Sequence, residues 1–503
     1  MSLGKVWLVG AGPGEPDLVT VRGRQVLEEA DVVLHDALSH PELLDYCVRA
    51  EIRDVGKRFG ERSPPQETIT QQLIELARQG KRTVRLKGGD PYLFARGAEE
   101  ALALADAGIP FEIVPGLSSP VAIGAYAGFP LTHRDLSSSV TFITGSDRAG
   151  KEWSAAAWQK LATATDTLCI LMGMRRIEPI TGALIDGGRS PDCPCAVVQW
   201  GARAEQRVVE GRLDDIAALC RAGGLSNPAV IFVGDVVRLR ERLRFFDNRP
   251  LFGKRILVPR ARHQASATAQ AIRRRAAQPI LFPLIEIAPP PDPAALARAA
   301  RAAATYDWVV FTSANGVERF WAALRDQGLD ARAFGAARVA AIGPRTARAL
   351  EPTGIVADLV AEEFVGEALA GAILARASGG RVLIPRALVA REELPHILRT
   401  RGFDVDVVAA YRTRPVGAER AGELSRRLEQ GELDVIVLTS SSTVSSLCEA
   451  LGSDKALLGR VVLASIGPVT SEALESFGLR ATVQADVYTV EGVLDALERH
   501  FGA

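Results

Sequence analysis

The feature that most constrains this chain is the stretch at residues 84–91, Val-Arg-Leu-Lys-Gly-Gly-Asp-Pro. A short β-forming run that ends in two glycines, an aspartate and a proline predicts a strand that stops at the rim of a sheet. At that rim, Gly88 and Gly89 let a ligand approach the main chain closely, and Asp90 can accept hydrogen bonds from it. The stretch therefore predicts a sheet with a ligand site at its edge.

The first half of the chain alternates short β-rich segments with helical ones, which indicates α/β architecture. A closing strand is expected over residues 228–237 and a new opening strand over 254–260. The segment 244–253 between them is short and partly apolar, so we expect it to pack against a domain rather than act as a free tether. Within the first half, strands are expected over 32–35, 84–86, 111–114, 140–144, 168–171 and 196–199, and helices over 67–79 and 97–107.

The second half contains an internal repeat. Residues 307–317 match 434–444, and residues 341–350 match 465–474. The repeat implies two similar α/β lobes. In each, Thr-Ser joins one strand to a helix, and Gly-Pro-x-Thr joins another strand to a helix. Small hydroxyl residues at such junctions make a natural anion site, because the first N–H groups of a helix are free.

Length and composition limit the class of protein. A chain of 503 residues is expected to hold two or more domains, and its 60 basic and 60 acidic side chains leave no bulk charge to attract nucleic acid. No apolar run approaches the roughly 20 residues of a membrane span, and the first residues predict a strand rather than a signal peptide. Six scattered cysteines do not resemble a disulfide framework, and Cys193-Pro194-Cys195 lacks the spacing of a metal site. We therefore expect a cytoplasmic protein with no metal, no membrane segment and no nucleic-acid partner.

The loop Gly10-Ala11-Gly12-Pro13-Gly14 invites comparison with a dinucleotide-binding loop, in which Asp36 would be the acid that binds ribose. Two residues argue against this interpretation. Pro13 removes an N–H that a pyrophosphate would use, and Glu15 stands where the third glycine belongs and puts a carboxylate near the phosphates. S-adenosylmethionine carries no phosphate, so neither objection applies to it.

Residues 3–245 resemble the uroporphyrinogen-III C-methyltransferases, which are tetrapyrrole methylases that use S-adenosylmethionine. The motifs that match, in the family's order, are 10–14, Asp36, Val55-Gly56-Lys57, 88–91, Val-Pro-Gly-Leu-Ser-Ser at 114–119, Pro-Leu-Thr-His-Arg at 130–134, Met-Gly-Met at 172–174, Gly201 with 206–209, and Asn-Pro-Ala at 227–229. Two positions depart from the family pattern. His35 replaces a more usual tyrosine, and Ser119 stands where alanine is common.

The resemblance implies roles for individual residues. Asp36 would accept a proton and Lys57 would donate one, because methylating a pyrrole-ring carbon leaves a cationic macrocycle that must lose a proton. The donor would contact Pro13, Gly88, Gly89, Asp90, Leu93, Ser118, Ser119, Met172 and Gly201, and the candidate partners for substrate carboxylates are Arg85, Arg96 and Arg134. Simpler alternatives remain: a strand-end turn for Asp36, a substrate carboxylate contact for Lys57, and surface ion pairs for the arginines.

From about residue 251 to its end, the chain resembles the uroporphyrinogen-III synthases. The matching parts are 258–260, 311–317, 342–346, 411–413, 438–441 and 466–470. The resemblance implies a methyltransferase domain at 1–245, a linker at 246–252 and a two-lobed synthase domain at 253–503. Its first lobe would be discontinuous, with residues of about 253–287 and 414–503, and the second lobe would be about 288–413. The segments 288–291 and 412–415 would be the two crossing strands, which act as hinges.

In that family the linear tetrapyrrole hydroxymethylbilane loses water, its ring D is inverted and the macrocycle closes. Holding a flexible anionic chain in the closing geometry matters more here than a strong acid or base. Tyr411 is the candidate for assisting departure of the hydroxyl group, with simple aromatic packing as the alternative. The expected carboxylate contacts, each with helix capping as its alternative, are Thr312, Ser313, Thr346, Ser440 and Thr470.

The product of the second domain is the substrate of the first. The two resemblances together therefore imply a bifunctional enzyme that cyclises hydroxymethylbilane to uroporphyrinogen III and methylates it twice to precorrin-2, on the route to sirohaem and cobalamin. One alternative is a methylase that acts on a different macrocycle. Another is a C-terminal half that only binds tetrapyrroles or regulates the methylase. The resemblance also suggests a homodimer through the methyltransferase half.

Overall fold

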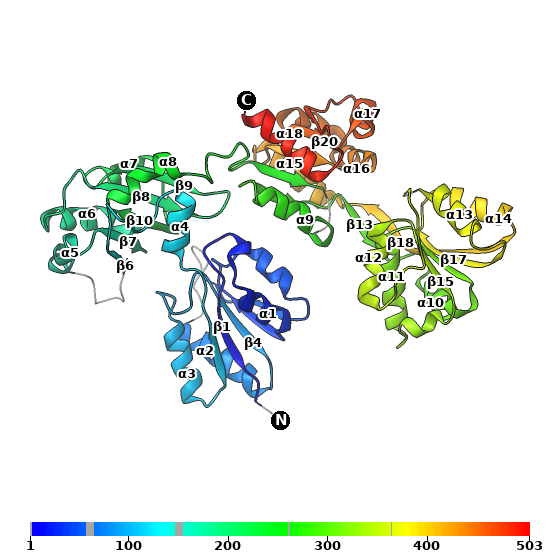
Figure 1. Ribbon diagram of the computed structural model, residues 1–503, viewed down its shortest axis with the longest axis horizontal. Coiled ribbons are helices and arrows are strands. Elements are labelled where there is room, and N and C mark those ends of the chain that lie inside the picture. Colours follow the sequence, from blue (N-terminus) through cyan, green and yellow to red (C-terminus); the bar gives the residue numbers. More distant parts are fainter. Residues whose placement is uncertain (1–2, 57–64, 146–153, 260–261, 364, 503) are drawn as a thin grey trace. The chain divides into compact units, whose positions relative to one another are not determined.

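A computed structural model describes residues 3–56, 65–145, 154–259, 262–363 and 365–502 (Figure 1). Lys57 and Arg260 therefore lie outside the described residues. The chain divides into two compact units, one of residues 1–256, 267–280 and 490–503 and the other of residues 257–266 and 281–489. Both units combine sheets with helices, which confirms the expected α/β class.

The first sheet is parallel and has the strand order β3-β2-β4-β1-β5. Its strands are β1 (Val6–Gly10), β2 (Val32–His35), β3 (Glu51–Asp54), β4 (Thr83–Lys87) and β5 (Phe111–Val114), and the helices of this part are α1 (Val21–Glu29), α2 (Gln66–Arg78), α3 (Gly97–Asp106) and α4 (Ser119–Ala127). The strands and helices expected in this region are confirmed to within one residue at each end.

Both faces of this sheet are buried, as expected for parallel strands. Along β1, Val6 and Leu8 pack with apolar residues of α2 and α3, whereas Trp7 and Val9 pack with those of α1. Successive side chains of a strand point to opposite faces. On β4 the same alternation sends Val84 and Leu86 to the α1 side. The polar positions of β4 must therefore face α2 and α3.

The second sheet has the order β6-β7-β10-β8-β9 and is mixed, because β10 runs antiparallel to both its neighbours. Its elements are β6 (Val140–Thr144), α5 (Ala155–Ala162), β7 (Thr167–Leu171), α6 (Ile177–Asp186), β8 (Pro194–Gln199), β9 (Arg207–Arg212), α7 (Ile216–Ala222), β10 (Ala229–Val233) and α8 (Arg240–Leu243). The strand expected over 228–237 is wrong at its end. It stops at Val233 because Gly234 has a φ of 151° and a 3-10 helix over Asp235–Leu239 follows.

The segment expected to link the halves packs, as its apolar residues indicated. Phe246 is buried, and its ring centroid lies 4.8 Å from that of Tyr126 in an edge-on contact. Leu251 is fully buried. These contacts confirm that the segment is not a free tether.

Two further sheets follow. A five-stranded sheet has the order β12-β11-β19-β20-β21, and a six-stranded sheet has the order β13-β18-β17-β14-β15-β16. The strands are β11 (Arg255–Val258), β12 (Gln278–Leu281), β13 (Ile285–Ala288), β14 (Trp308–Phe311), β15 (Arg338–Ala341), β16 (Leu359–Val360), β17 (Gly380–Ala387), β18 (Phe403–Pro415), β19 (Val435–Leu438), β20 (Val462–Ser465) and β21 (Val483–Gln484). The helices are α9 (Arg262–Arg273), α10 (Pro293–Arg301), α11 (Ala314–Arg325), α12 (Pro344–Leu350), α13 (Gly366–Leu374), α14 (Glu393–Thr400), α15 (Ala418–Glu429), α16 (Ser441–Leu451), α17 (Pro468–Ser476) and α18 (Val490–Gly502).

The internal repeat is confirmed in the structure. Thr-Ser joins β14 to α11 and β19 to α16, and Gly-Pro leads from β15 into α12 and from β20 into α17. Of the two expected crossing segments, 412–415 is confirmed as the end of β18, whereas 288–291 is wrong in its bounds, because β13 ends at Ala288 and the prolines at 289–291 cannot donate to a strand pair. β13 and β18 pair antiparallel, with Ala288 opposite Arg412. All strands of the six-stranded sheet come from residues 285–415, whereas the five-stranded sheet uses 255–281 and 435–484.

Within the parts of the chain that are described, no helix is long and apolar enough to span a bilayer. Over the same residues, no three His, Cys, Asp or Glu side chains are grouped so that they could hold a metal ion.

Phe320 on α11 provides a test of the packing around the six-stranded sheet. Its side chain is fully buried, and its ring centroid lies 5.6 Å from that of Phe311 and 5.7 Å from that of Phe334. Phe320→Ala should lower the free energy of unfolding by about 3–5 kcal/mol, because the cavity is lined by rings that cannot collapse into it. The control Val356→Ala removes a side chain that is 82% exposed. Urea denaturation should show a lower midpoint for the first variant alone, and equal midpoints would contradict the packing described.

Candidate functional site

Two glycine loops meet at the carboxyl-terminal edge of the first sheet, where its parallel strands end. The loop at residues 10–14 follows β1, and the loop at 88–91 follows the adjacent strand β4. From β1 the chain continues toward the β2 side of the sheet, whereas from β4 it continues toward the β5 side. The adjacent strands β1 and β4 therefore form a topological switch point, where ligands of open α/β sheets bind. The Gly89 N–H donates to the Gly12 carbonyl at 2.8 Å, and the Gly12 N–H donates to the Gly89 carbonyl at 3.3 Å.

A third loop, at residues 115–119 after β5, packs on the same glycines. A Cβ atom on Gly116 would lie 2.2 Å from the Gly89 carbonyl oxygen, and one on Gly10 would lie 2.4 Å from the Gly116 Cα. Gly89 itself has a φ of 70°, and a Cβ there would lie no closer than 3.8 Å to its nearest neighbour, the backbone nitrogen of Ser119. The three loops thus form a cradle of bare backbone.

Asp90 holds two of these loops together. Its Oδ1 accepts from the Tyr92 N–H at 2.8 Å and its Oδ2 accepts from the Gly116 N–H at 3.0 Å. The Leu93 N–H donates to the Asp90 carbonyl at 3.4 Å, which closes the turn. The carboxylate therefore shapes the cradle, and a ligand has to bond to its remaining lone pairs.

Of the other residues predicted to contact the methyl donor, Pro13, Ser118 and Gly201 lie beside this cradle. Ser118 precedes α4, yet its side chain makes no capping bond, which leaves the hydroxyl available to a ligand. Pro13 is half-buried beside Gly14, and a Cβ on Gly14 would lie 2.9 Å from the carbonyl oxygen of buried Gly201. Met172 lies at the end of β7, exposed and with a φ of 55°.

The structure also bears on the dinucleotide alternative. A pyrophosphate loop leads directly into a helix whose N-terminus holds the phosphates. Here a 3-10 turn over Pro16–Leu18 intervenes, and α1 begins only at Val21. These features disfavour a dinucleotide at this edge.

Asp36 follows β2 at the same edge of the sheet. Its N–H donates to the Leu86 carbonyl at 3.1 Å, and its Oδ1 accepts from Arg85 Nη2. The Asp36 side chain keeps 30% of its surface exposed, whereas Arg85 is 2% exposed. A buried arginine on β4 therefore holds a carboxylate that is open to solvent.

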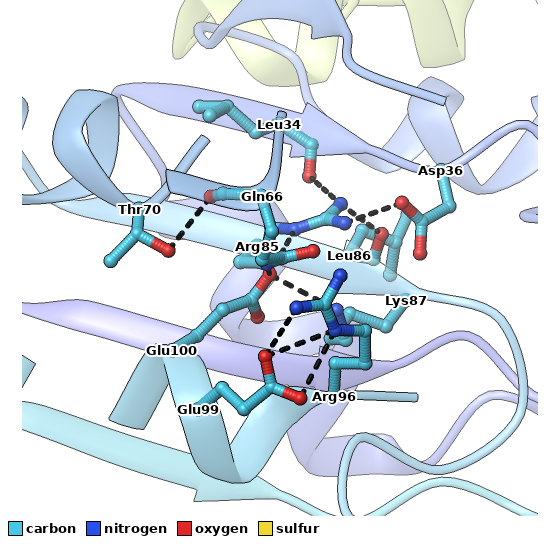
Figure 2. A network of polar contacts seen from close by, with 10 residues as sticks. All are labelled: Leu34, Asp36, Gln66, Thr70, Arg85, Leu86, Lys87, Arg96, Glu99 and Glu100. Atoms are coloured by element: carbon cyan, nitrogen blue, oxygen red, sulfur yellow. Dashed lines mark hydrogen bonds and ion pairs between the residues drawn. The ribbon is translucent and has the colours of Figure 1, made fainter. Parts of the chain in front are cut away.

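Behind Asp36 lies a buried charged cluster (Figure 2). Glu100 on α3 is fully buried, and its Oε1 lies 3.2 Å from Arg85 Nε and 3.1 Å from Lys87 Nζ. Gln66 of α2 donates to the same oxygen at 2.6 Å. Burial lowers the pKa of the Lys87 ammonium, the positive charge of Arg85 lowers it further, and Glu100 opposes both effects.

The three arginines predicted to bind substrate carboxylates have different environments. Arg85 is committed to Asp36, Glu100 and two backbone carbonyls, which favours a positioning role over a substrate contact. Arg96 is exposed, and its Nε donates to Glu99 Oε2 at 3.0 Å. Arg134 is exposed in the loop between α4 and β6.

In the second half, the structure brings together two predicted residues that are 98 positions apart. The Tyr411 hydroxyl lies 3.0 Å from Ser313 Oγ. Ser313 also caps α11, because its Oγ accepts from the Gly316 N–H at 3.0 Å. Tyr411 is 7% exposed and lies near the end of β18, so its hydroxyl stands at the helix N-terminus that the sequence predicted as an anion site.

The remaining predicted hydroxyls lie at equivalent junctions. Thr312 is half-buried beside Ser313, and Ser440 caps α16 by accepting from the Thr443 N–H at 3.3 Å. Thr346 and Thr470 are buried in the first turns of α12 and α17. Helix capping is confirmed for Ser313 and Ser440, and carboxylate binding by these hydroxyls stays a prediction.

Sequence analysis missed Gln66, Lys87 and Glu100. The signal that could have found them is the polar alternation Thr83, Arg85, Lys87 on a strand that is central in a parallel sheet. Such a strand is buried on both faces, so charges on it require partners from the covering helices.

Comparisons with known proteins match the two halves of the chain to two different families. The family model of tetrapyrrole (corrin/porphyrin) methylases matches residues 5–217, and that of uroporphyrinogen-III synthase HemD matches residues 266–495. A porphyrin biosynthesis protein HemD of Ruminiclostridium josui is 36% identical over 499 residues, which are 99% of this chain and 98% of that protein.

Other relatives match one half. A siroheme synthase of Pseudomonas fluorescens (strain SBW25) is 47% identical over 245 residues, 48% of this chain and 52% of that protein, so the chain spans about half the length of this relative. A solved uroporphyrin-III C-methyltransferase from Thermus thermophilus is 41% identical with a TM-score of 0.41, covering 49% of this chain and 98% of that one.

The expected pair of domains is thereby confirmed. Since a relative of 36% identity is matched along nearly its whole length, the chain belongs to this family of porphyrin biosynthesis proteins, with a tetrapyrrole methylase domain followed by a uroporphyrinogen-III synthase domain.

Proposed function

We propose that the second half cyclises hydroxymethylbilane to uroporphyrinogen III and that the first half methylates this product twice to precorrin-2. The observation that carries the methylation step is the placement of Asp36. Its carboxylate is partly exposed at the sheet edge where the glycine loops form their cradle, and buried Arg85 holds it there. The fusion of the two domains supports the order of the reactions, because one domain makes what the other consumes.

S-adenosylmethionine is the donor that fits the cradle. Its adenosine and methionine parts carry no phosphate, so they need neither the N–H that Pro13 lacks nor a helix N-terminus at the loop. The cradle presents the backbone of Gly88 and Gly89 and the uncapped hydroxyl of Ser118. When bound, the donor supplies an electrophilic methyl group on sulfur.

Asp36 then serves as the proton acceptor. A ring carbon of the macrocycle forms a bond to the methyl group as the methyl–sulfur bond breaks, and the macrocycle gains a positive charge. Loss of a proton from the macrocycle to Asp36 removes this added positive charge. Lys57, predicted as the proton donor, lies outside the described residues and keeps that role as part of the proposal. Arg96 and Arg134, both exposed, are the candidates for substrate carboxylates.

In the synthase half, Tyr411 assists departure of the substrate hydroxyl, which leaves as water. The Tyr411 and Ser313 hydroxyls share a hydrogen bond at the start of α11, where free N–H groups of the helix also favour anionic groups. The substrate carries many carboxylates, so helix N-termini with Thr312, Thr346, Ser440 and Thr470 nearby suit it. A C-terminal half that only binds tetrapyrroles is the competing proposal, and it predicts no ring closure.

Three wider assignments belong to the same proposal. We place the protein in the cytoplasm, because all six cysteines are free, as in reducing compartments. We expect a homodimer through the methyltransferase half and no nucleic-acid partner. The domain limits at 245 and 253, and the two synthase lobes, likewise remain proposed.

The donor site can be tested with two glycine variants of the full chain. Gly89 and Gly108 have φ angles of 70° and 67°, so alanine costs about 1–2 kcal/mol of backbone strain at either position. Only Gly89→Ala also puts a methyl group into the cradle. Calorimetry should show that wild type and Gly108→Ala bind S-adenosylmethionine and not NAD, and that Gly89→Ala binds it at least about tenfold more weakly. Tight NAD binding without S-adenosylmethionine binding would refute the proposal.

Asp36→Asn should leave donor affinity unchanged and lower methyl transfer to uroporphyrinogen III by about 10²–10⁴-fold, the usual contribution of a general base. The reason is that the amide cannot take the proton from the methylated macrocycle. Turnover is measured as precorrin-2 formed, with donor affinity measured on the same preparation. A rate within a few-fold of wild type would show that Asp36 is only a turn residue.

Tyr411→Phe should slow closure with inversion while methylation of supplied uroporphyrinogen III continues. Hydroxymethylbilane also closes spontaneously without inversion, so isomer I should accumulate at the expense of isomer III. Tyr306→Phe is the matched control, because Tyr306 is also buried and donates to Asp406 at 2.7 Å, but at the opposite end of the same sheet. If both variants give the wild-type isomer ratio and rate, Tyr411 is a packing residue.

A further inference from the structure

In the buried cluster behind Asp36, the reaction proposed above uses Arg85 but gives no role to Lys87 or Glu100. Arg85 and Lys87 are each 2% exposed and Glu100 is fully buried, and all three are joined by contacts of 3.2 Å or less. Figure 2 shows that Arg85 lies between Asp36 and Glu100, with Lys87 beside Glu100. A single chain of contacts therefore runs from α3 through β4 to the proton acceptor.

Arg85 is held from several sides. Its Nε donates to Glu100 Oε1 at 3.2 Å, its Nη1 lies 3.4 Å from the Leu34 carbonyl and 3.3 Å from the Leu86 carbonyl, and its Nη2 donates to Asp36 Oδ1. The planar guanidinium is rigid, so fixing Nε also fixes the direction of Nη2. Asp36 is thereby engaged through one oxygen, and among the described residues Oδ2 accepts no hydrogen bond from a side chain or backbone.

Charge explains why Glu100 controls this arrangement. Arg85 and Lys87 bring two buried positive charges to this region, and buried Glu100 and partly exposed Asp36 bring two negative ones. Glu100 is the only one of these carboxylates that contacts both cations. Without its charge, Lys87 and Arg85 would repel each other, and Arg85 would lose the anchor of its Nε. Glu100 itself is supported in the first turn of α3, where the helix dipole favours an anion.

We propose that Glu100 is a positioning residue for methyl transfer, which acts through Arg85 to keep the free oxygen of Asp36 turned toward the macrocycle. This inference rests on the proposed function, in which Asp36 takes the proton. This positioning role accounts for the burial of the charged side chain of Glu100, whereas the neighbouring Glu99 is more exposed.

The first test is Glu100→Gln in the full chain. The kcat for precorrin-2 formation from uroporphyrinogen III should fall about 10- to 100-fold, whereas the KM for S-adenosylmethionine and the affinity for S-adenosylhomocysteine should stay within about twofold. The control Glu75→Gln removes the charge of an exposed carboxylate on α2 and should change neither. A wild-type kcat in Glu100→Gln overturns the proposal.

A double-mutant cycle with Asp36→Asn separates positioning from a general structural effect. If Glu100 acts through Asp36, adding Glu100→Gln to Asp36→Asn should lower kcat by less than about threefold more. An equal fold-loss in both backgrounds overturns the role of Glu100 and leaves that of Asp36 intact. Full turnover in Asp36→Asn alone instead refutes the proposed function itself, and the inference with it.

If Glu100→Gln does not fold, Glu100→Asp decides the question. It keeps the negative charge near both cations and withdraws the carboxylate from Arg85 and Lys87 by one methylene group, which breaks the contact that orients Arg85. The variant should bind S-adenosylhomocysteine as wild type does and show a kcat lowered at least about fivefold. Unchanged kcat in this folded variant overturns the proposal.

Discussion

The methylase half depends on burying two cations on the central strand of a parallel sheet. Taking an ion out of water costs several kcal/mol, and removing one partner of a buried pair typically costs about 3–5 kcal/mol. Arg85 and Lys87 can therefore face α2 and α3 only because Glu100 meets them there, itself held by a hydrogen bond from Gln66. The strand that carries these cations also carries the Gly-Gly-Asp-Pro loop. The same interaction thus fixes the strand, the loop and Asp36.

How much of this could be predicted depends on how local each signal is. The strands over 111–114 and 140–144, and the Thr-Ser and Gly-Pro junctions of the repeat, follow from short patterns and are confirmed. The role of Arg85 does not follow from such a short pattern. The run Val-Arg-Leu-Lys alternates apolar and polar residues, as a strand with one solvent-exposed face does. Glu100, the partner of Arg85, lies fifteen residues further along the chain, inside a helix. Only the position of β4 between β2 and β1 shows that these charges are buried.

The synthase half shows the same limit in another form. Sequence analysis names Tyr411 and Ser313 separately, but it cannot place them 3.0 Å apart, because the contact depends on how β18 returns to the sheet that holds β14. Hydroxyls at strand-to-helix junctions were expected to cap helices or to bind carboxylates. The structure shows that Ser313 and Ser440 cap their helices, and capping leaves a serine oxygen with further hydrogen-bonding capacity.

The two halves handle similar anionic tetrapyrroles by different means, and the chemistry explains the difference. Methylation leaves a cationic macrocycle that must lose a proton, so the proposed site needs an acceptor held in one orientation, and buried charges can supply that rigidity. Ring closure needs a flexible chain to be held in one shape, and neutral hydroxyls and helix N-termini are able to bind carboxylates without the cost of burying a full charge. In the proposed function, the cluster of Arg85, Lys87 and Glu100 serves the first requirement and the Tyr411–Ser313 pair serves the second.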